Sequence, residues 1–350
     1  MQEILELAKK LIEFKSVSTN LNEINRCITF IKDYFKDTNL IIKTHIKNEK
    51  TSLVITFKDT KTPKVFFSGH IDVVPVQNEK QFTPIIEGDK LIARGAADMK
   101  TAVATFMHIF KQLSIQNKTP DIGLMIVSDE EIGGFDCSGH LVELGYKSEF
   151  FLAGEITNLQ VGNMAKGILS FDVKTKGVGA HSAYAWEGEN AIEKMMDALK
   201  KINELFEKPQ ANTFKTTCNI ATIKGGSAMN MVPENCQARV DIRYIPQEDS
   251  NQILNKIKQT CPQIQIDQAL NEPACLCDEQ NQYVQKLINL GAKGFLKKHG
   301  GSDARFFSKV GIPAIVFGPV GYNLHCENEY LEIPSIEKYQ KIIEDFIEQI

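Results

Sequence analysis

The first part of the chain alternates short apolar runs with stretches of helical periodicity. Four apolar runs have the length and composition of buried strands: residues 52–57, 64–69, 122–128 and 150–155. The amphipathic N-terminus and the run from Met99 to Leu113 have apolar residues at the spacing typical of helices. Because buried strands that alternate with helices form parallel sheets covered by those helices, this part predicts a mostly parallel α/β sheet.

The pattern changes near Lys166. Residues 168–177 alternate apolar and polar side chains, which is typical of a strand with one face in water. The elements expected after it are a helix, two strands, a helix and a strand, at 191–206, 218–226, 236–244, 251–260 and 264–266. The order β-α-β-β-α-β predicts a ferredoxin-like α+β domain.

After about Pro273 the chain returns to helix, a buried strand at Ile312–Gly318 and a final helix from Pro334. We therefore predict one α/β domain formed by residues 1–165 and 274–350. A smaller α+β domain at 166–273 is inserted into it.

Composition narrows the possible functions. The 350 residues are 43% hydrophobic and 24% charged with a formal net charge of -4, as in an ordinary globular protein. The sequence has no basic stripe of the kind that binds nucleic acid and no apolar segment long enough to span a membrane. We therefore expect neither a nucleic-acid nor a membrane partner. The sequence also lacks a signal-peptide pattern, and its eight cysteines form no CxxC pair. We expect a cytoplasmic protein with reduced thiols.

Side chains that bind divalent metals recur where predicted strands end or helices begin. Such residues are His70, Asp98, Glu130, Glu131, Glu155 and His325. Each has an ordinary explanation by itself, for example Asp98 as a helix cap or the two adjacent glutamates as a solvated turn. In open α/β sheets, however, ligands bind beyond the carboxyl ends of the strands. The joint pattern predicts that two bound cations balance the clustered acids.

Seven motifs occur in the order GHIDVVP, ARGAADMK, SDEEIGG, AGE, GAHSA, GGSAMNMVP and FGPVGYNLH. In this order they resemble the M20 family of zinc amidohydrolases. The closest resemblance is to the branch of acetylornithine deacetylase and succinyl-diaminopimelate desuccinylase, which are enzymes of amino-acid biosynthesis. The resemblance covers nearly the whole chain, and its H-x-D, R-G-x-x-D and D-E-E elements are the most specific.

The resemblance implies two divalent metal ions per chain, with zinc expected first and cobalt or manganese as alternatives. Asp98 would bridge them, with His70 and Glu155 completing one site and Glu131 and His325 completing the other. Asp72 would fix the imidazole of His70, and Glu130 would be the general base. The family also implies a cis peptide bond at Asp98–Met99.

The resemblance further implies a homodimer formed through the inserted domain, which would act as a lid. His181 would reach the partner subunit's active site and stabilise the oxyanion, assisted by Asn230. Arg243 and Ser302 would bind a substrate carboxylate. From the residues alone, the pattern favours a surface histidine for His181, and Asn230 can be a turn residue. Arg243 is equally consistent with a solvated strand residue.

Two departures from the family pattern leave the exact substrate open. Ile156 follows Glu155 where the family usually has proline, and the stretch after His181 also lacks its usual proline. Within the family, a glutamate at position 155 favours deacylases and carboxypeptidases, whereas aspartate favours aminopeptidases.

We therefore predict a di-zinc hydrolase that cleaves the amide bond of a small N-acyl amino acid. Metal-activated water would attack the carbonyl, with Glu130 as general base. The alternative is a dipeptidase or carboxypeptidase that uses the same centre on a short peptide. A binding protein that has lost activity is disfavoured, because every expected ligand position and the base are filled.

Overall fold

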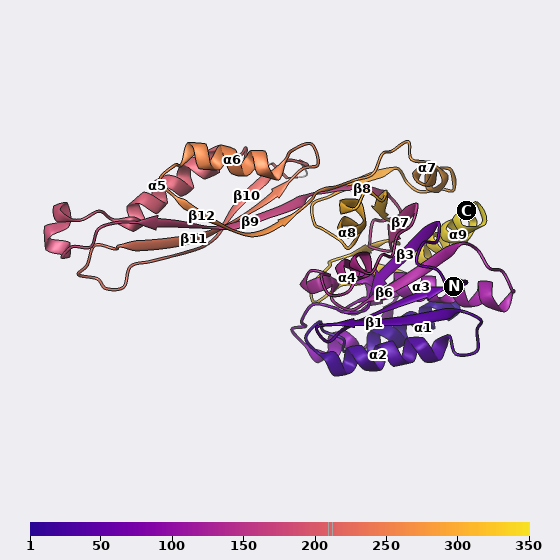
Figure 1. Ribbon diagram of the computed structural model, residues 1–350. Coiled ribbons are helices and arrows are strands. Elements are labelled where there is room, and N and C mark those ends of the chain that lie inside the picture. The colour runs from indigo at the N-terminus through magenta and orange to yellow at the C-terminus, as the bar shows by residue number, and fades with distance from the viewer. Residues whose placement is uncertain (209, 212) are drawn as a thin grey trace. The chain divides into compact units, whose positions relative to one another are not determined.

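The computed structural model describes residues 1–208, 210–211 and 213–350 and divides the chain into two compact units (Figure 1). Unit 1 contains Met1–Met164, Leu276–Leu296 and Ser302–Ile350. Unit 2 contains Ala165–Cys275 together with the short segment Lys297–Gly301. The sequence analysis had assigned that short segment to the α/β domain.

Unit 1 is built on a nine-stranded sheet. Its strands are β1 (Ile41–Lys47), β2 (Lys50–Thr56), β3 (Val65–His70), β6 (Ile122–Val127), β7 (Phe150–Ala153), β8 (Val161–Ala165), β13 (Cys275–Leu276), β14 (Phe295–Lys298) and β15 (Ala314–Val316). They run in the order β1-β2-β6-β3-β7-β15-β8-β13, and β14 pairs with β8. The neighbouring strands β6, β3, β7 and β15 are parallel, which confirms the predicted α/β class.

The sheet is mostly but not wholly parallel, as predicted, and β8 pairs with β15 in the antiparallel direction. Strand β2 is antiparallel to both β1 and β6. The reason is local, because only Asn48 and Glu49 separate β1 from β2, and both residues have positive φ, 45° and 64°. A two-residue turn of this kind joins adjacent strands into an antiparallel hairpin, whereas a parallel connection needs a longer crossover.

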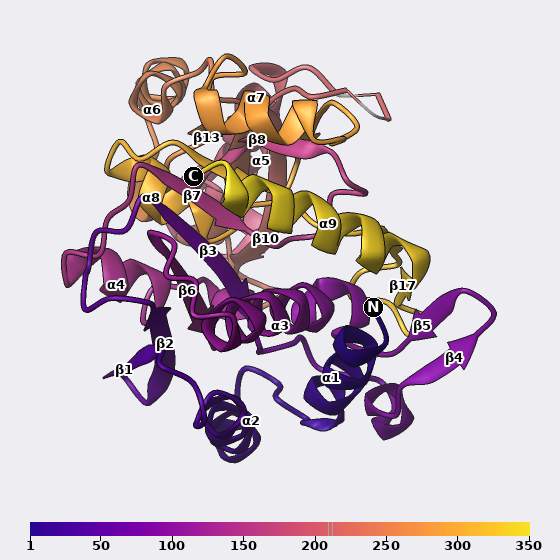
Figure 2. The same cartoon turned by 90° about the vertical axis from the view of Figure 1, so that its right-hand side faces the viewer.

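Helices cover both faces of this sheet (Figure 2). Phe150 contacts Phe346, whereas its neighbour Phe151 stacks on Phe307, so adjacent residues of β7 bury opposite faces. None of the helices in the described ranges is long and apolar enough to cross a membrane. The helices of unit 1 are α1 (Gln2–Glu13), α2 (Leu21–Tyr34), α3 (Thr101–Ile115), α4 (Ser138–Glu143), α7 (Gln282–Asn289), α8 (Ala304–Lys309) and α9 (Pro334–Glu348).

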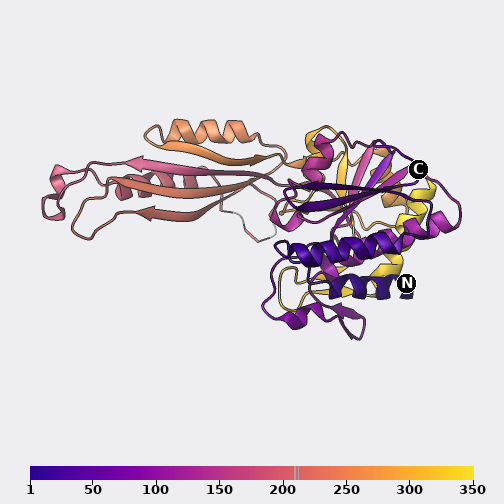
Figure 3. The same ribbon diagram turned by 60° about the horizontal axis from the view of Figure 1, so that its bottom comes forward.

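Unit 2 has the predicted β-α-β-β-α-β order. Its elements are β9 (Gly167–Lys176), α5 (Ala191–Glu204), β10 (Thr217–Gly225), β11 (Asn235–Tyr244), α6 (Ser250–Thr260) and β12 (Gln265–Glu272). The strands form an antiparallel sheet in the order β10-β11-β9-β12. Leu169, Phe171 and Val173 of β9 are fully buried, and α5 and α6 contribute to the same core (Figures 1 and 3).

A second, small sheet in unit 1 was not predicted from the sequence. It consists of β4 (Ile85–Glu87), β5 (Lys90–Ile92), β16 (Gly321–Tyr322) and β17 (Tyr330–Glu332) in the order β16-β17-β5-β4. Strands of two or three residues carry too little periodicity to be recognised. Their pairing matters for the site, because Tyr330 lies opposite Ile92 and so brings the segments around Asp98 and His325 together.

Candidate metal centre

Three parallel strands end at the same edge of the large sheet, and each delivers candidate ligands there. His70 is the last residue of β3, Glu130 and Glu131 follow β6, and Glu155 follows β7. Because the strands run in the same direction, their carboxyl ends bring these side chains together, as expected for a ligand site in an α/β sheet.

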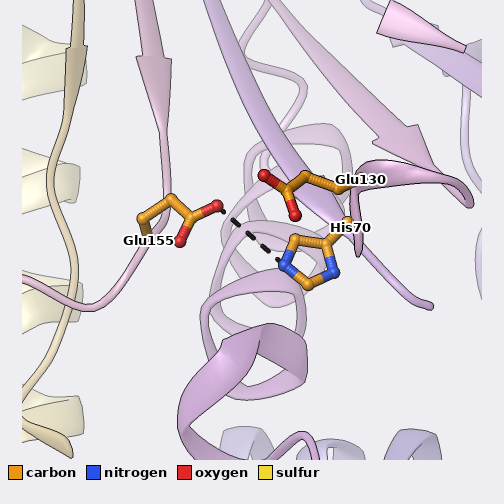
Figure 4. A group of neighbouring side chains, drawn as sticks. All are labelled: His70, Glu130 and Glu155. Atoms are coloured by element: carbon orange, nitrogen blue, oxygen red, sulfur yellow. Dashed lines mark ion pairs between the residues drawn. The ribbon is translucent and has the colours of Figure 1, made fainter. Parts of the chain in front are cut away.

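The first cluster surrounds His70. Its Nε2 atom lies 3.1 Å from Oδ1 of Asp98 and 3.9 Å from Oε1 of Glu155. Figure 4 shows the carboxylates of Glu130 and Glu155 directed toward the imidazole from two sides. His70, Glu130 and Glu155 each offer a ligand atom within 4.8 Å of the others.

The second cluster lies on the other side of Asp98. The Nε2 atom of His325 lies 3.3 Å from Oδ2 of Asp98 and 3.3 Å from Oε2 of Glu131. The two oxygens of Asp98 therefore face two different imidazoles, those of His70 and His325. His70, Asp98 and Glu131 form a further group of ligand atoms within 4.8 Å.

The electrostatics of the site indicate an excess of negative charge. Burial, together with the charge of Glu155, raises the pKa of Glu130 well above its ordinary value. Hydrogen bonds to Asp98 and Glu131 raise the pKa of His325 to about 10. Burial lowers the pKa of His70, but hydrogen bonds to Asp72 and Asp98 outweigh it and hold the pKa well above its ordinary value.

This donor set fits divalent metal ions. Imidazole nitrogens and carboxylate oxygens are ligands that zinc, cobalt and manganese share, and here they converge from five separate segments. Asp98 and Glu155 are almost completely buried, so their charges require nearby compensation. Bound cations would supply it and would make the clustering of acids favourable.

Asp72 is fully buried beneath the turn that carries Glu130 and Glu131. Its two carboxylate oxygens accept the backbone N–H groups of Glu130 and Glu131, each at 3.2 Å, and Oδ2 also accepts the hydroxyl of Ser18 at 2.8 Å. The nearest acceptor of His70 Nδ1 is the main-chain oxygen of Asp72 at 2.9 Å, whereas Oδ1 lies at 3.5 Å. Asp72 thus supports both the imidazole and the acidic turn.

Glycine is required after this acidic turn. Gly133 and Gly134 have φ values of +113° and +65°, a region that other residues rarely adopt. A Cβ atom on Gly134 would also lie 2.1 Å from Oδ1 of Asp303. The two glycines therefore let the chain reverse immediately after the ligands while it packs closely on the segment around Asp303.

The segment around Asp98 has two further features. The Asp98–Met99 peptide bond is cis, which confirms the expectation from the resemblance. Glu329, which the sequence analysis did not single out, accepts three backbone N–H groups of this segment, from Gly95, Ala97 and Asp98, at 2.9, 3.0 and 3.1 Å. Its other oxygen lies 2.5 Å from Nη1 of Arg94. The strand that follows Glu329, β17, is too short to be predicted from the sequence, so only the fold reveals that this glutamate is buried.

The remaining candidates lie in different segments. In unit 2, the segments that carry His181 and Asn230 are neighbours, because the backbone N–H of Ser182 donates to the carbonyl of Asn230 at 3.0 Å. His181 itself is exposed, and its Nδ1 accepts the N–H of Ala183 at 3.1 Å.

The two residues expected to bind a substrate carboxylate have other contacts. Arg243 lies on β11, where its Nε donates to Asp241 at 2.8 Å. Ser302, in unit 1, is buried just before α8. Its main-chain oxygen accepts the N–H of Arg305 at 3.2 Å.

Known proteins are similar to this chain over nearly its whole length. The family model described as peptidase family M20/M25/M40 matches residues 66–349. A succinyl-diaminopimelate desuccinylase from Hydrogenovibrio crunogenus is 30% identical over 98% of this chain and 97% of its own length. A probable carboxypeptidase from Ajellomyces dermatitidis is 31% identical over 73% of this chain and 64% of its own length. Among solved structures, the aminopeptidase PepT from Bacillus cereus has a TM-score of 0.80 at 18% identity, covering 99% of this chain and 98% of that one.

Proposed function

Because this chain belongs to peptidase family M20/M25/M40, we propose that it is a two-metal hydrolase that cleaves the amide bond of a small N-acyl amino acid. The observation that carries the proposal is the position of Asp98, whose two oxygens face His70 and His325 at 3.1 and 3.3 Å. Full-length similarity to a succinyl-diaminopimelate desuccinylase supports a deacylase rather than a peptidase.

We assign the ligands to two cations, zinc in the first instance and cobalt or manganese as alternatives. His70, Asp98 and Glu155 would hold one ion. Asp98, Glu131 and His325 would hold the other, so that Asp98 serves both. When bound, two such ions lower the pKa of a water molecule and polarise the amide carbonyl.

Glu130 is the general base in this proposal. Its carboxylate is directed toward the centre rather than toward bulk solvent, and burial favours its protonated form (Figure 4). When ionised, this carboxylate can take a proton from the attacking water, and its raised pKa lets it hold that proton until it delivers it to the leaving amine. The 3₁₀ turn at Glu130–Ile132 separates the side chains of Glu130 and Glu131, so that adjacent residues can serve as base and ligand.

His181 is proposed to stabilise the oxyanion. Since its Nδ1 accepts the N–H of Ala183, the neutral ring carries its proton on Nε2, which can donate a hydrogen bond to developing negative charge. Asn230, on the segment bonded to Ser182, would assist. Arg243 and Ser302 remain our candidates for the substrate carboxylate, and Arg243 would have to exchange its bond to Asp241.

A homodimer formed through unit 2 would bring His181 to the active site of a partner subunit. Strand β10 is the edge of its sheet, and it exposes apolar side chains that a second copy of the chain could cover. Exposed apolar residues of unit 2 include Val178, Tyr184, Trp186, Met196, Ile220, Ile223, Met229 and Met231. A cytoplasmic location also remains a prediction from the sequence.

The proposal is tested by parallel assays of the zinc-loaded protein. The substrates are N-succinyl-diaminopimelate, N-acetylornithine and a panel of dipeptides. We expect turnover of an N-acyl amino acid and little or none of the dipeptides. Preferred hydrolysis of dipeptides would support the alternative peptidase function, which the similarity to a probable carboxypeptidase favours. Hydrolysis of no amide at all would contradict both.

A further inference from the structure

We propose that Glu329 is a positioning residue of the metal centre, which orients Asp98 by accepting the backbone N–H groups of the turn that carries it. The inference rests on the proposed metal centre and concerns a residue that contributes no ligand atom to it. Glu329 is completely buried, so its carboxylate would be unfavourable without specific partners.

All three N–H donors converge on one oxygen of Glu329. Gly95, Ala97 and Asp98 donate to Oε1 at 2.9, 3.0 and 3.1 Å. Three backbone hydrogen bonds to one buried oxygen, all from within four consecutive residues, fix the path of the turn. The side chain of Asp98 leaves this turn toward His70 and His325, so a change in the path would move both of its oxygens.

The backbone of Glu329 is bound to the same segment. Its carbonyl accepts the N–H of Ala93 at 3.1 Å, one residue beyond the pairing of Tyr330 with Ile92 between β17 and β5. Glu329 is also only four residues from His325 in the chain. One residue therefore links the segment carrying Asp98 to the segment carrying His325.

Gln81 provides a second connection between these segments. Its main-chain oxygen accepts the N–H of Arg94 at 2.8 Å, and its side-chain amide donates to the carbonyl of Glu327 at 3.3 Å. Because this connection is independent of the carboxylate of Glu329, removal of that carboxylate should loosen the turn without separating the two segments.

The ion pair with Arg94 does not by itself explain why Glu329 is buried. Nη1 of Arg94 lies 2.5 Å from Oε2, but Nε and Nη2 of the same buried guanidinium have no hydrogen-bond partner within the described residues. A buried pair that leaves donors unsatisfied contributes little to stability. We therefore attribute the role of Glu329 to its three backbone contacts, with Arg94 compensating its charge.

The test is a titration of metal-free protein with Co²⁺, followed by calorimetry and by the visible absorption of the bound ion. In Glu329→Ala we expect at least one of two Co²⁺ ions to bind about 10–100-fold more weakly, as is typical when an outer-shell partner is lost. The absorption spectrum should change, while far-ultraviolet circular dichroism stays that of wild type. Wild-type affinity and spectrum in the folded variant would overturn the proposal.

A double variant separates the backbone contacts from the ion pair. Arg94→Met/Glu329→Gln keeps an acceptor oxygen for the three N–H groups and removes the charged pair. We expect it to recover Co²⁺ affinity to within about threefold of wild type, well inside the loss expected for an outer-shell partner. Affinity as weak as in Glu329→Ala would overturn the role of the backbone contacts. A double variant that does not fold would assign Glu329 to folding and would overturn the proposal too.

Asp249→Ala is the matched control. Asp249 also accepts a backbone N–H, that of Gln252 at 2.9 Å, but it caps α6 in unit 2. Its loss should leave Co²⁺ binding unchanged. Failure of the wild-type protein to bind two Co²⁺ ions would instead contradict the proposed metal centre itself, an outcome distinct from wild-type binding in Glu329→Ala.

Discussion

Neighbouring residues in the SDEEIGG motif have different surroundings, although they share one turn. Glu131 lies 3.3 Å from His325, whereas Glu130 groups with His70 and Glu155. Both backbone N–H groups are held by the buried carboxylate of Asp72. The motif thus supplies one metal ligand and one proton acceptor in our proposal, and single substitutions can distinguish them.

Glu130→Gln should abolish the proton acceptor while it preserves the size of the side chain. We expect kcat to fall by about 10²–10⁴-fold, as is typical when a general base is removed. Two metal ions per chain should remain, as measured by elemental analysis after gel filtration. Glu131→Gln is the matched comparison and should lose metal. Near-normal turnover by Glu130→Gln would refute its assignment as the base.

At the scale of elements, the contact between α1 and α3 contains a histidine that responds to pH. His108 of α3 is 9% exposed, and its Nδ1 lies 3.4 Å from a carboxylate oxygen of Glu3. Burial lowers its pKa from the ordinary value of 6.5, although the charge of Glu3 acts in the opposite direction. The folded protein therefore takes up this proton at lower pH than the unfolded chain.

The sign of the stability effect follows from this difference. His108 contributes its full stability above pH 6.5 and loses it as the pH falls from there through its lower folded pKa. His108→Gln should therefore show a smaller decrease of Tm between about pH 7 and pH 5 than wild type. Both proteins are measured with a chelator, so that metal release does not contribute. Parallel decreases in the two proteins would contradict the prediction.

At the scale of the whole molecule, the proposal requires two chains. Unit 2 exposes apolar side chains along β10, and His181 is exposed rather than packed in its own core. Association through this edge would bury the apolar surface and complete the sheet. It would also make activity depend on the dimer, since the oxyanion donor would come from the partner subunit.

Ile223→Glu tests this dependence. Ile223 lies on β10 and is 49% exposed, and a charge there should oppose association. We expect light scattering to show monomers with normal metal content and strongly reduced kcat. Ile86→Glu is the matched control, because Ile86 is 46% exposed on β4 of unit 1 and should leave the dimer intact. A fully active monomer would exclude a catalytic role for the partner.

The sequence predicted those parts of the molecule that have strong periodicity or a distinctive motif. The strands that lead to His70 and Glu155 are mostly apolar runs, and β9 alternates clearly between apolar and polar residues. The hairpin of β1 and β2 was missed, because β2 is as apolar as a parallel strand and its direction depends on the turn at Asn48. Glu329 was missed because burial of a glutamate depends on the pairing of short strands that are distant in sequence.

The central claim is that five side chains hold two metal ions, and anomalous diffraction from crystals grown with zinc tests it most directly. We predict two peaks at the zinc absorption edge, both in contact with Asp98. One should also contact His70 and Glu155, and the other Glu131 and His325. The absence of a peak at Asp98, or zinc bound only elsewhere on the chain, would contradict the account.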